Sequence, residues 1–110
     1  MVNPETWYSH DVTWWALAGV SAAGDPTFAA PVPIKGHWRE HREIFVAADG
    51  SEKVSKSIVH VDRDLAEGDF ILLGLTTNAD PFAVSGERIE GWRKSRVPFE
   101  DVHVRRAYLT

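Results

Sequence analysis

Residues 34–63, IKGHWREHREIFVAADGSEKVSKSIVHVDR, constrain the fold more than any other stretch of the chain. Asp49-Gly50 is a strong signal for a hairpin turn, and it lies midway between two segments that mix polar and apolar residues. The stretch therefore predicts one long β-hairpin.

Two turn geometries are compatible with Asp49-Gly50, and they place opposite faces of the hairpin against the core. A two-residue turn gives the cross-strand pairs Phe45 with Val54 and His41 with Ile58. A three-residue turn over residues 48–50, with Gly50 in the left-handed region, gives the pairs Ile44 with Val54 and Trp38 with His60. We favour the three-residue turn, because it gathers apolar residues of both strands on one face. A slip by one residue would scatter them over both faces.

The favoured turn predicts a core face and a second face. The core face carries Ile34, Trp38, Ile44, Val54 and Ile58. The second face carries the polar residues His37, Arg39, His41, Glu43, Lys53, Ser55 and Ser57, together with Phe45, Val59 and Val61. The polar residues of the second face suit water or a partner protein, but its three apolar residues mean that it is not purely a solvent face.

The rest of the chain supplies further strands and two long connections. Strands are expected over residues 6–17, 70–75, 87–97 and 102–109. Residues 70–75 (FILLGL) are apolar throughout, as is typical of a central strand, and Gly91 suggests a bulge in the third segment. Residues 18–33 and 76–86 are expected to be loops, and Pro31 and Pro33 argue against a central strand there.

These elements predict an all-β fold in a single domain, residues 1–110. No window favours a helix strongly, so we expect a small antiparallel β-barrel or compact sandwich of about six strands, with one long hairpin and long loops. A length of 110 residues suits one domain with its own core.

Adjacent tryptophans mark the first predicted strand. Trp14 and Trp15 must point to opposite faces, because successive side chains alternate along a strand. Either the strand is covered on both sides, or the face that carries Trp7 and Trp15 meets another subunit. We expect Trp14 in the core and Trp15 at an interface.

Composition excludes several classes of protein. The chain has no cysteine, so it forms neither disulfides nor thiolate metal sites. Its net charge of −4 argues against a dedicated binder of duplex DNA. The first residues lack the pattern of a signal peptide, and no apolar run approaches the roughly 20 residues of a membrane span. We therefore expect a protein of the cytoplasm without a membrane partner.

Charge is unevenly distributed along the chain. Residues 62–69 contain four acidic side chains and only one basic one, Arg63, whereas residues 88–106 contain six basic side chains and three acidic ones. The simplest interpretation is two solvated turns. The alternative is a head-to-tail contact in which the acidic edge of one copy meets the basic edge of the next.

No sequence pattern supports catalysis or metal binding. Residues 37–41 (HWREH) match an inverted zinc-protease motif, but on a strand His37 and His41 would lie about 13 Å apart, too far for one zinc ion. The chain lacks a nucleophile elbow and a phosphate-binding glycine loop. We therefore expect no enzyme activity, no catalytic residue, no metal and no cofactor.

The order of these features resembles that of the head–tail joining proteins of tailed bacteriophages, also called head-completion, head-closure or stopper proteins. The resemblance is carried by the following segments: residues 8–15 (YSHDVTWW), 36–40 (GHWRE), 45–50 (FVAADG), 54–55, 59–62 (VHVD), 68–72 (GDFIL), 88–89, 97–98 and 106–109 (RAYL). The long segments 18–33 and 76–86 depart from a compact member of that family.

The resemblance implies a structural virion protein of the neck, assembled in the host cytoplasm. It would form a homo-oligomeric ring between the portal or adaptor ring and the tail terminator or tail tube, and help to retain double-stranded DNA that passes without specific binding. The interface residues we expect are Trp7, Trp15, Ala48, Asp49, Gly50, Ser51, Glu52, Lys53, Asp62, Asp64, Glu67, Arg93, Arg105 and Arg106. The alternatives are another tail component, such as a tail terminator or tail-tube-like β protein, and an oligonucleotide-binding barrel.

Overall fold

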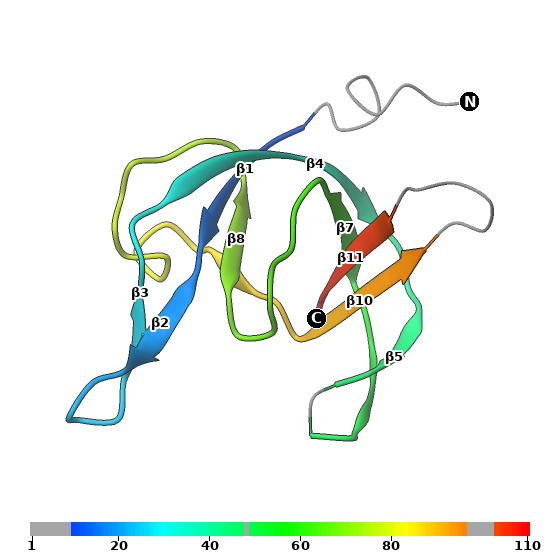
Figure 1. The fold of residues 1–110 in the computed structure, drawn as a ribbon, viewed down its shortest axis with the longest axis horizontal. Helices are drawn as coiled ribbons and strands as arrows, with labels where there is room; N and C mark the ends of the chain where they lie inside the picture. The colour runs from blue at the N-terminus through cyan, green and yellow to red at the C-terminus, as the bar shows by residue number, and fades with distance from the viewer. Residues whose placement is uncertain (1–9, 48, 97–102) are drawn as a thin grey trace.

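The computed structural model describes residues 10–47, 49–96 and 103–110, and within these ranges it contains eleven β-strands and no helix (Figure 1). The strands are β1 (His10–Trp15), β2 (Leu17–Val20), β3 (Pro26–Phe28), β4 (Val32–Glu40), β5 (Ile44–Val46), β6 (Glu52–Val54), β7 (Ser57–Val61), β8 (Phe70–Leu73), β9 (Glu87–Arg88), β10 (Gly91–Arg96) and β11 (His103–Leu109). The all-β prediction is confirmed.

Seven strands form one antiparallel sheet in the order β10-β11-β7-β4-β1-β8-β9. Strands β9 and β10 follow one another in the chain but lie at opposite ends of this order, so the sheet has to curl until its ends approach each other (Figure 1). The result is a half-barrel. Two short ribbons, β2–β3 and β5–β6, project from it on the same side, toward opposite ends of the long axis.

The main core lies inside the curl of the sheet. Its buried members are Val12, Ile34, Val59, Val61, Leu65, Ile71, Ile89, Ala107 and Leu109, with Trp14, Val32, Trp38 and Trp92 packed against them. Every strand of the large sheet or the turn beside it contributes to this set, because alternate residues of each strand point inward. A second, smaller cluster joins Phe45, Ala47, Ile58 and Tyr108.

The turn of the long hairpin follows the three-residue prediction. Ala47 N donates to Ser51 O at 2.9 Å, and Gly50 between them has a φ of 84°. Ile44 pairs with Val54, as predicted.

The predicted pairing of Trp38 with His60 is wrong, because the hairpin contains a bulge. Trp38 pairs with Val59, since three residues of one strand (41–43) lie opposite two of the other (55–56). The Ser55 hydroxyl spans the bulge: it donates to His41 O at 2.7 Å and accepts from Glu43 N at 3.0 Å.

The bulge also corrects the predicted core face. Ile34 is buried in the main core as expected, but across the bulge the faces exchange. Val59 and Val61, assigned to the second face, lie in the main core with Ile34, whereas Ile58 lies opposite Arg39 and joins the smaller cluster. Ile44 and Val54 are therefore 67% and 55% exposed, whereas Phe45, assigned to the second face, is buried.

The connection over residues 18–33 is more ordered than the predicted loop. It contains the β2–β3 ribbon, which turns at Gly24 with a φ of 89°, and the start of β4. Pro33 lies within β4, opposite Thr13 of β1, so the argument against a central strand is wrong. A proline is accommodated there because β4 pairs with β7 only from Gly36 onward, which leaves the second edge of Pro33 without a strand.

The remaining segments follow the predictions more closely. In the FILLGL segment, Phe70 and Ile71 are buried, but Leu73 is 52% and Leu75 61% exposed, so burial on both faces holds only for the first two residues. Residues 87–96 are broken before Gly91: β9 pairs with β8 and β10 pairs with β11, so this one segment connects the two ends of the sheet.

Candidate functional site

The β5–β6 ribbon presents an apolar surface to solvent. Pairing of Ile44 with Val54 and of Val46 with Glu52 puts these four side chains on one face. Ile44, Val46 and Val54 are 67%, 62% and 55% exposed. We call this face, Ile44, Val46, Glu52 and Val54, the ribbon ridge.

The opposite face of the ribbon is packed against the half-barrel. The Phe45 ring stacks on Tyr108, with ring centroids 4.8 Å apart, and Ala47 joins the same buried cluster. Lys53 Nζ lies 3.3 Å from Glu90 Oε2. Because these contacts hold the ribbon in place, the ribbon ridge is oriented toward solvent.

The tip of the ribbon is polar and exposed. Both the backbone N and the Oγ of Ser51 donate to Asp49 Oδ1, at 2.9 and 2.6 Å, and these bonds lower the pKa of Asp49. Of the interface residues expected here, Asp49, Gly50, Ser51 and Glu52 are exposed and Lys53 is half-buried. Ala48 lies outside the described residues.

Residues of the predicted acidic edge form ion pairs within their own chain. Arg105 Nε lies 2.7 Å and Lys94 Nζ 3.2 Å from the carboxylate of Asp64. The hydrogen bond from Arg105, followed by that from Lys94, lowers the pKa of Asp64. Asp64 and Arg105 were expected to meet residues of a neighbouring copy; the structure instead joins them to each other, because β11 brings Arg105 beside the turn after β7.

The other acidic residues expected at this edge differ from one another. Asp62 lies 3.2 Å from its neighbour Arg63, so it also has a cation within the chain. Glu67 is half-buried, and no ion pair joins it to a described residue.

Basic residues form a row across the convex face of the sheet. The registers place His37 opposite His60, His60 opposite Arg106, and Arg106 opposite Arg93. Within the described part of the chain, neither Arg93 nor Arg106 forms an ion pair with an acidic side chain. The sequence singled out the two arginines, but the row itself depends on the register.

His60 is the most perturbed group in this row. It is 6% exposed, and burial is the main reason why its pKa falls from 6.5 to about 4. The positive charges of Arg106 and Arg39 and the nearby His37 act in the same direction. His60 is therefore neutral at physiological pH.

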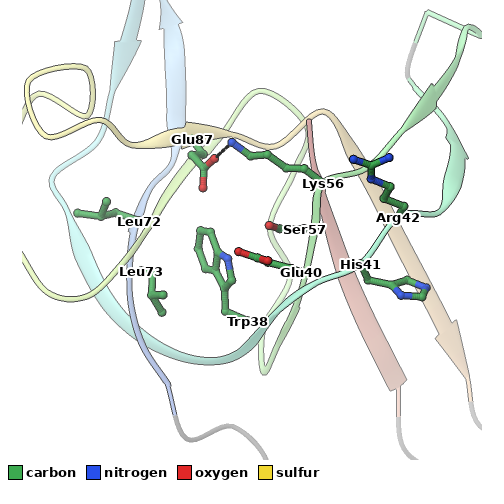
Figure 2. A pocket seen from close by; sticks show the side chains of 9 residues that line it. All are labelled: Trp38, Glu40, His41, Arg42, Lys56, Ser57, Leu72, Leu73 and Glu87. Carbon is green, nitrogen blue, oxygen red and sulfur yellow. Dashed lines mark ion pairs between the residues drawn. The ribbon is translucent and has the colours of Figure 1, made fainter.

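A hollow of about 700 Å³ opens from the interior of the half-barrel (Figure 2). Figure 2 shows the Trp38 indole at its centre, the Glu40 carboxylate beside it, and the ion pair of Lys56 with Glu87 across one side. The imidazole of His41 points away from it. The hollow is a wide concave surface with a polar rim, and its side chains do not form a nucleophile–base pair.

A second hollow, of about 390 Å³, lies between the β2–β3 ribbon and the body of the half-barrel. We call this hollow the apolar groove. Its walls include Leu17, Val20, Pro26, Phe70, Phe82 and Arg88. Phe82 is 58% exposed and its ring lies 4.9 Å from that of Phe70. Sequence reasoning missed this site, because its residues come from four segments that only the fold brings together.

Both tryptophans are covered within the subunit. Trp15 is 0% exposed, and its Nε1 donates to Asn78 O at 2.9 Å, so the loop after β8 covers it within the same subunit. Trp14 is half-buried, and its Nε1 donates to the buried carboxylate of Asp69 at 3.0 Å. The expectation that Trp15 is available to another subunit is wrong: the strand is covered on both sides. Trp7 lies outside the described residues.

The histidine pair of the zinc-like motif does not converge. His37 lies in β4 with its ring beside those of His10 and His60, at centroid distances of 5.7 and 6.2 Å, whereas His41 follows the end of that strand. No group of three or more His, Cys, Asp or Glu side chains in the described ranges is placed to hold a metal ion. That the protein binds no metal and no cofactor remains a prediction.

The fold and these surfaces define a class: an antiparallel half-barrel that carries a projecting ribbon with an exposed apolar face. No protein-family model matches the sequence, and no curated protein matches it. Among the described residues, no helix is long and apolar enough to cross a membrane.

Proposed function

We propose that this protein is a structural subunit of the head–tail connector of a tailed bacteriophage, a ring-forming head-closure or stopper protein. In that role it would contact the portal or adaptor ring on one side and the tail on the other, and help to retain packaged DNA in the virion. The proposal is based on the resemblance in the order of the sequence segments, and it assigns a structural rather than a catalytic role.

The observation that carries the proposal is the ribbon ridge. A two-stranded ribbon that exposes three β-branched aliphatic side chains incurs a hydration cost in a free monomer, and such surfaces usually mark protein contacts. The packing of Phe45 on Tyr108 keeps the ridge pointed outward. A net charge of −4 suits a channel through which DNA passes without adhering.

The first alternative, another tail component such as a tail terminator or tail-tube-like protein, would use the same kind of surface. The oligonucleotide-binding alternative is less well supported. Binding of single strands needs exposed aromatic side chains between basic ones. Trp92 packs against the core and Lys94 pairs with Asp64, and Phe82 is the only large aromatic side chain that is exposed within the described ranges.

The test is to delete the coding sequence from the phage genome that carries it and to examine the particles by electron microscopy. We expect DNA-filled heads that lose their DNA and free tails of normal length, with joining restored when the protein is supplied from a plasmid. Heads that retain DNA beside tails of abnormal length would instead indicate a tail terminator. Normal infectious particles would refute a role in the virion.

A direct measurement separates the binding-module alternative. Fluorescence anisotropy with a labelled single-stranded oligonucleotide is expected to show no saturable binding at moderate salt. Saturable binding that weakens steeply as salt increases would favour the oligonucleotide-binding barrel, because release of counterions drives such binding.

A further inference from the structure

Two apolar surfaces of this molecule, the ribbon ridge and the apolar groove, are exposed to solvent. The ribbon ridge is an exposed face of the two-stranded ribbon that projects from the half-barrel (Figure 1). The apolar groove is concave, with a volume of about 390 Å³, and the aliphatic and aromatic side chains of its walls match the aliphatic side chains of the ridge. Burial of both surfaces would remove several exposed apolar side chains from water.

The charges of the two surfaces are also complementary. The ridge carries one charged side chain, the carboxylate of Glu52, which lies on the same face as Ile44 and Val54. The groove has one charged wall residue, Arg88, which forms an ion pair of 4.0 Å with Glu90 of its own chain and whose side chain is 59% exposed. One acidic group on the ridge therefore matches one basic group in the groove.

The ridge cannot reach the groove of its own chain. Figure 1 shows the β5–β6 ribbon and the β2–β3 ribbon toward opposite ends of the molecule, with the half-barrel between them. The ribbon is fixed there by Phe45 on Tyr108 and by Lys53 with Glu90. A contact between ridge and groove has to join two molecules.

We propose that the ribbon ridge of one copy docks in the apolar groove of the next copy. This inference rests on the proposed function in taking the partner to be a second copy of this chain, and it identifies the contact between subunits of the ring. Ridge and groove are different surfaces, so the contact is heterologous: each subunit uses both, and repetition closes a ring or extends a filament. The geometry of this one repeated contact then sets the whole assembly.

Chemical cross-linking tests the contact. Because the chain has no natural cysteine, only the introduced cysteines can react. Val54→Cys is placed on the ridge and Val20→Cys on the groove, where the native side chains are 55% and 69% exposed. The purified double variant is treated with a short bismaleimide. We expect a ladder of covalent oligomers, because each subunit can be linked on both sides.

Mixed single variants and a matched control define the other outcomes. An equal mixture of V54C and V20C is expected to give dimers only. Covalent dimers from V54C alone would overturn the proposal in favour of a ridge-to-ridge contact, and absence of cross-links from the double variant would also overturn it. The control combines Val20→Cys with Leu75→Cys, at a site after β8 that is 61% exposed, and is expected to remain monomeric.

A substitution tests the apolar character of the contact. Val46→Asp, on the ridge, is expected to weaken self-association at least tenfold in sedimentation experiments, whereas Leu75→Asp, at a site that is similarly exposed (61% against 62%), is expected to leave it unchanged. Equal effects of the two variants would contradict the proposal.

These experiments separate the contact from the proposed function. A covalent ladder together with normal particles after gene deletion would support the contact and refute the connector role. Leaking heads together with an absence of cross-links would support the connector role and refute this contact.

Discussion

Trp15 shows how much a single side chain contributes to this small core. It is 0% exposed, packed beneath the loop that follows β8, and its indole N–H is bonded to Asn78 O. We expect Trp15→Ala to lower the free energy of unfolding by about 3–5 kcal/mol, because it leaves a large cavity. Chemical denaturation of the purified variant measures the loss.

Trp14→Ala is the matched comparison. Trp14 is half-buried and bonds to Asp69, so its removal should cost clearly less than removal of Trp15. A larger loss from Trp14→Ala would contradict the assignment of Trp15 to the interior.

His60 gives the stability of the protein a defined dependence on pH. Its pKa falls from 6.5 to about 4 on folding, chiefly through burial. Between these values the unfolded chain binds a proton that the folded chain does not, so stability decreases as the pH falls from 6.5 toward 4. The loss from this residue reaches about 3 kcal/mol near the lower limit, at 1.36 kcal/mol per pKa unit.

The check is urea denaturation at several pH values for the wild type and for His60→Gln, which cannot acquire the charge. We expect a weaker dependence on pH in the variant over this interval. The nearby Arg106, Arg39 and His37 remain in both proteins, so the difference reports His60 itself. Identical slopes would show that His60 is protonated equally in the folded and unfolded chains.

At the scale of elements, the β5–β6 ribbon depends on the absence of a side chain at Gly91. A Cβ at this position would lie 2.4 Å from Phe45 Cδ2 and 2.6 Å from Cε2. We expect Gly91→Ala to displace the Phe45 ring from Tyr108 and to lower the free energy of unfolding by about 1–3 kcal/mol.

Gly19→Ala provides the control for this substitution. Its new Cβ would lie 3.8 Å from Thr27 Oγ1, an ordinary contact, so we expect a change within about 0.5 kcal/mol. Thermal unfolding of both variants compares them. If Gly91→Ala were as stable as Gly19→Ala, the ribbon would not be held by the contact between Phe45 and Tyr108.

At the scale of the whole molecule, the nature of the contact between copies determines its response to salt. Exposed charge pairs weaken at high ionic strength, since the Debye length shrinks to about 3 Å at 1 M, whereas apolar contacts do not. Asp64 pairs with Lys94 and Arg105 of its own chain, so the acidic edge has less charge to offer a neighbour.

We therefore expect self-association to persist or strengthen between low salt and about 1 M salt. Sedimentation velocity at several concentrations measures it. Dissociation at high salt would favour a contact between the acidic and basic edges, with Asp62, Glu67 and Arg93 as its main candidates.

The sequence by itself determined the local features of this protein. Alternating polar and apolar residues specified strands, and Asp49-Gly50 specified the turn between them, because both signals act between residues close in the chain. The all-β class and the three-residue turn were predictable for this reason, whereas the bulge predicted at Gly91 is instead a break between strands at opposite ends of the sheet.

The tertiary structure alone decided which faces are buried. One extra residue in the bulge at 41–43 buries Phe45 and exposes Ile44, and nothing in the local pattern specifies that exchange. The loop that covers Trp15 and the walls of the apolar groove likewise come from segments distant in sequence. Burial depends on which segments meet in space, and a local pattern contains no information about its distant partners.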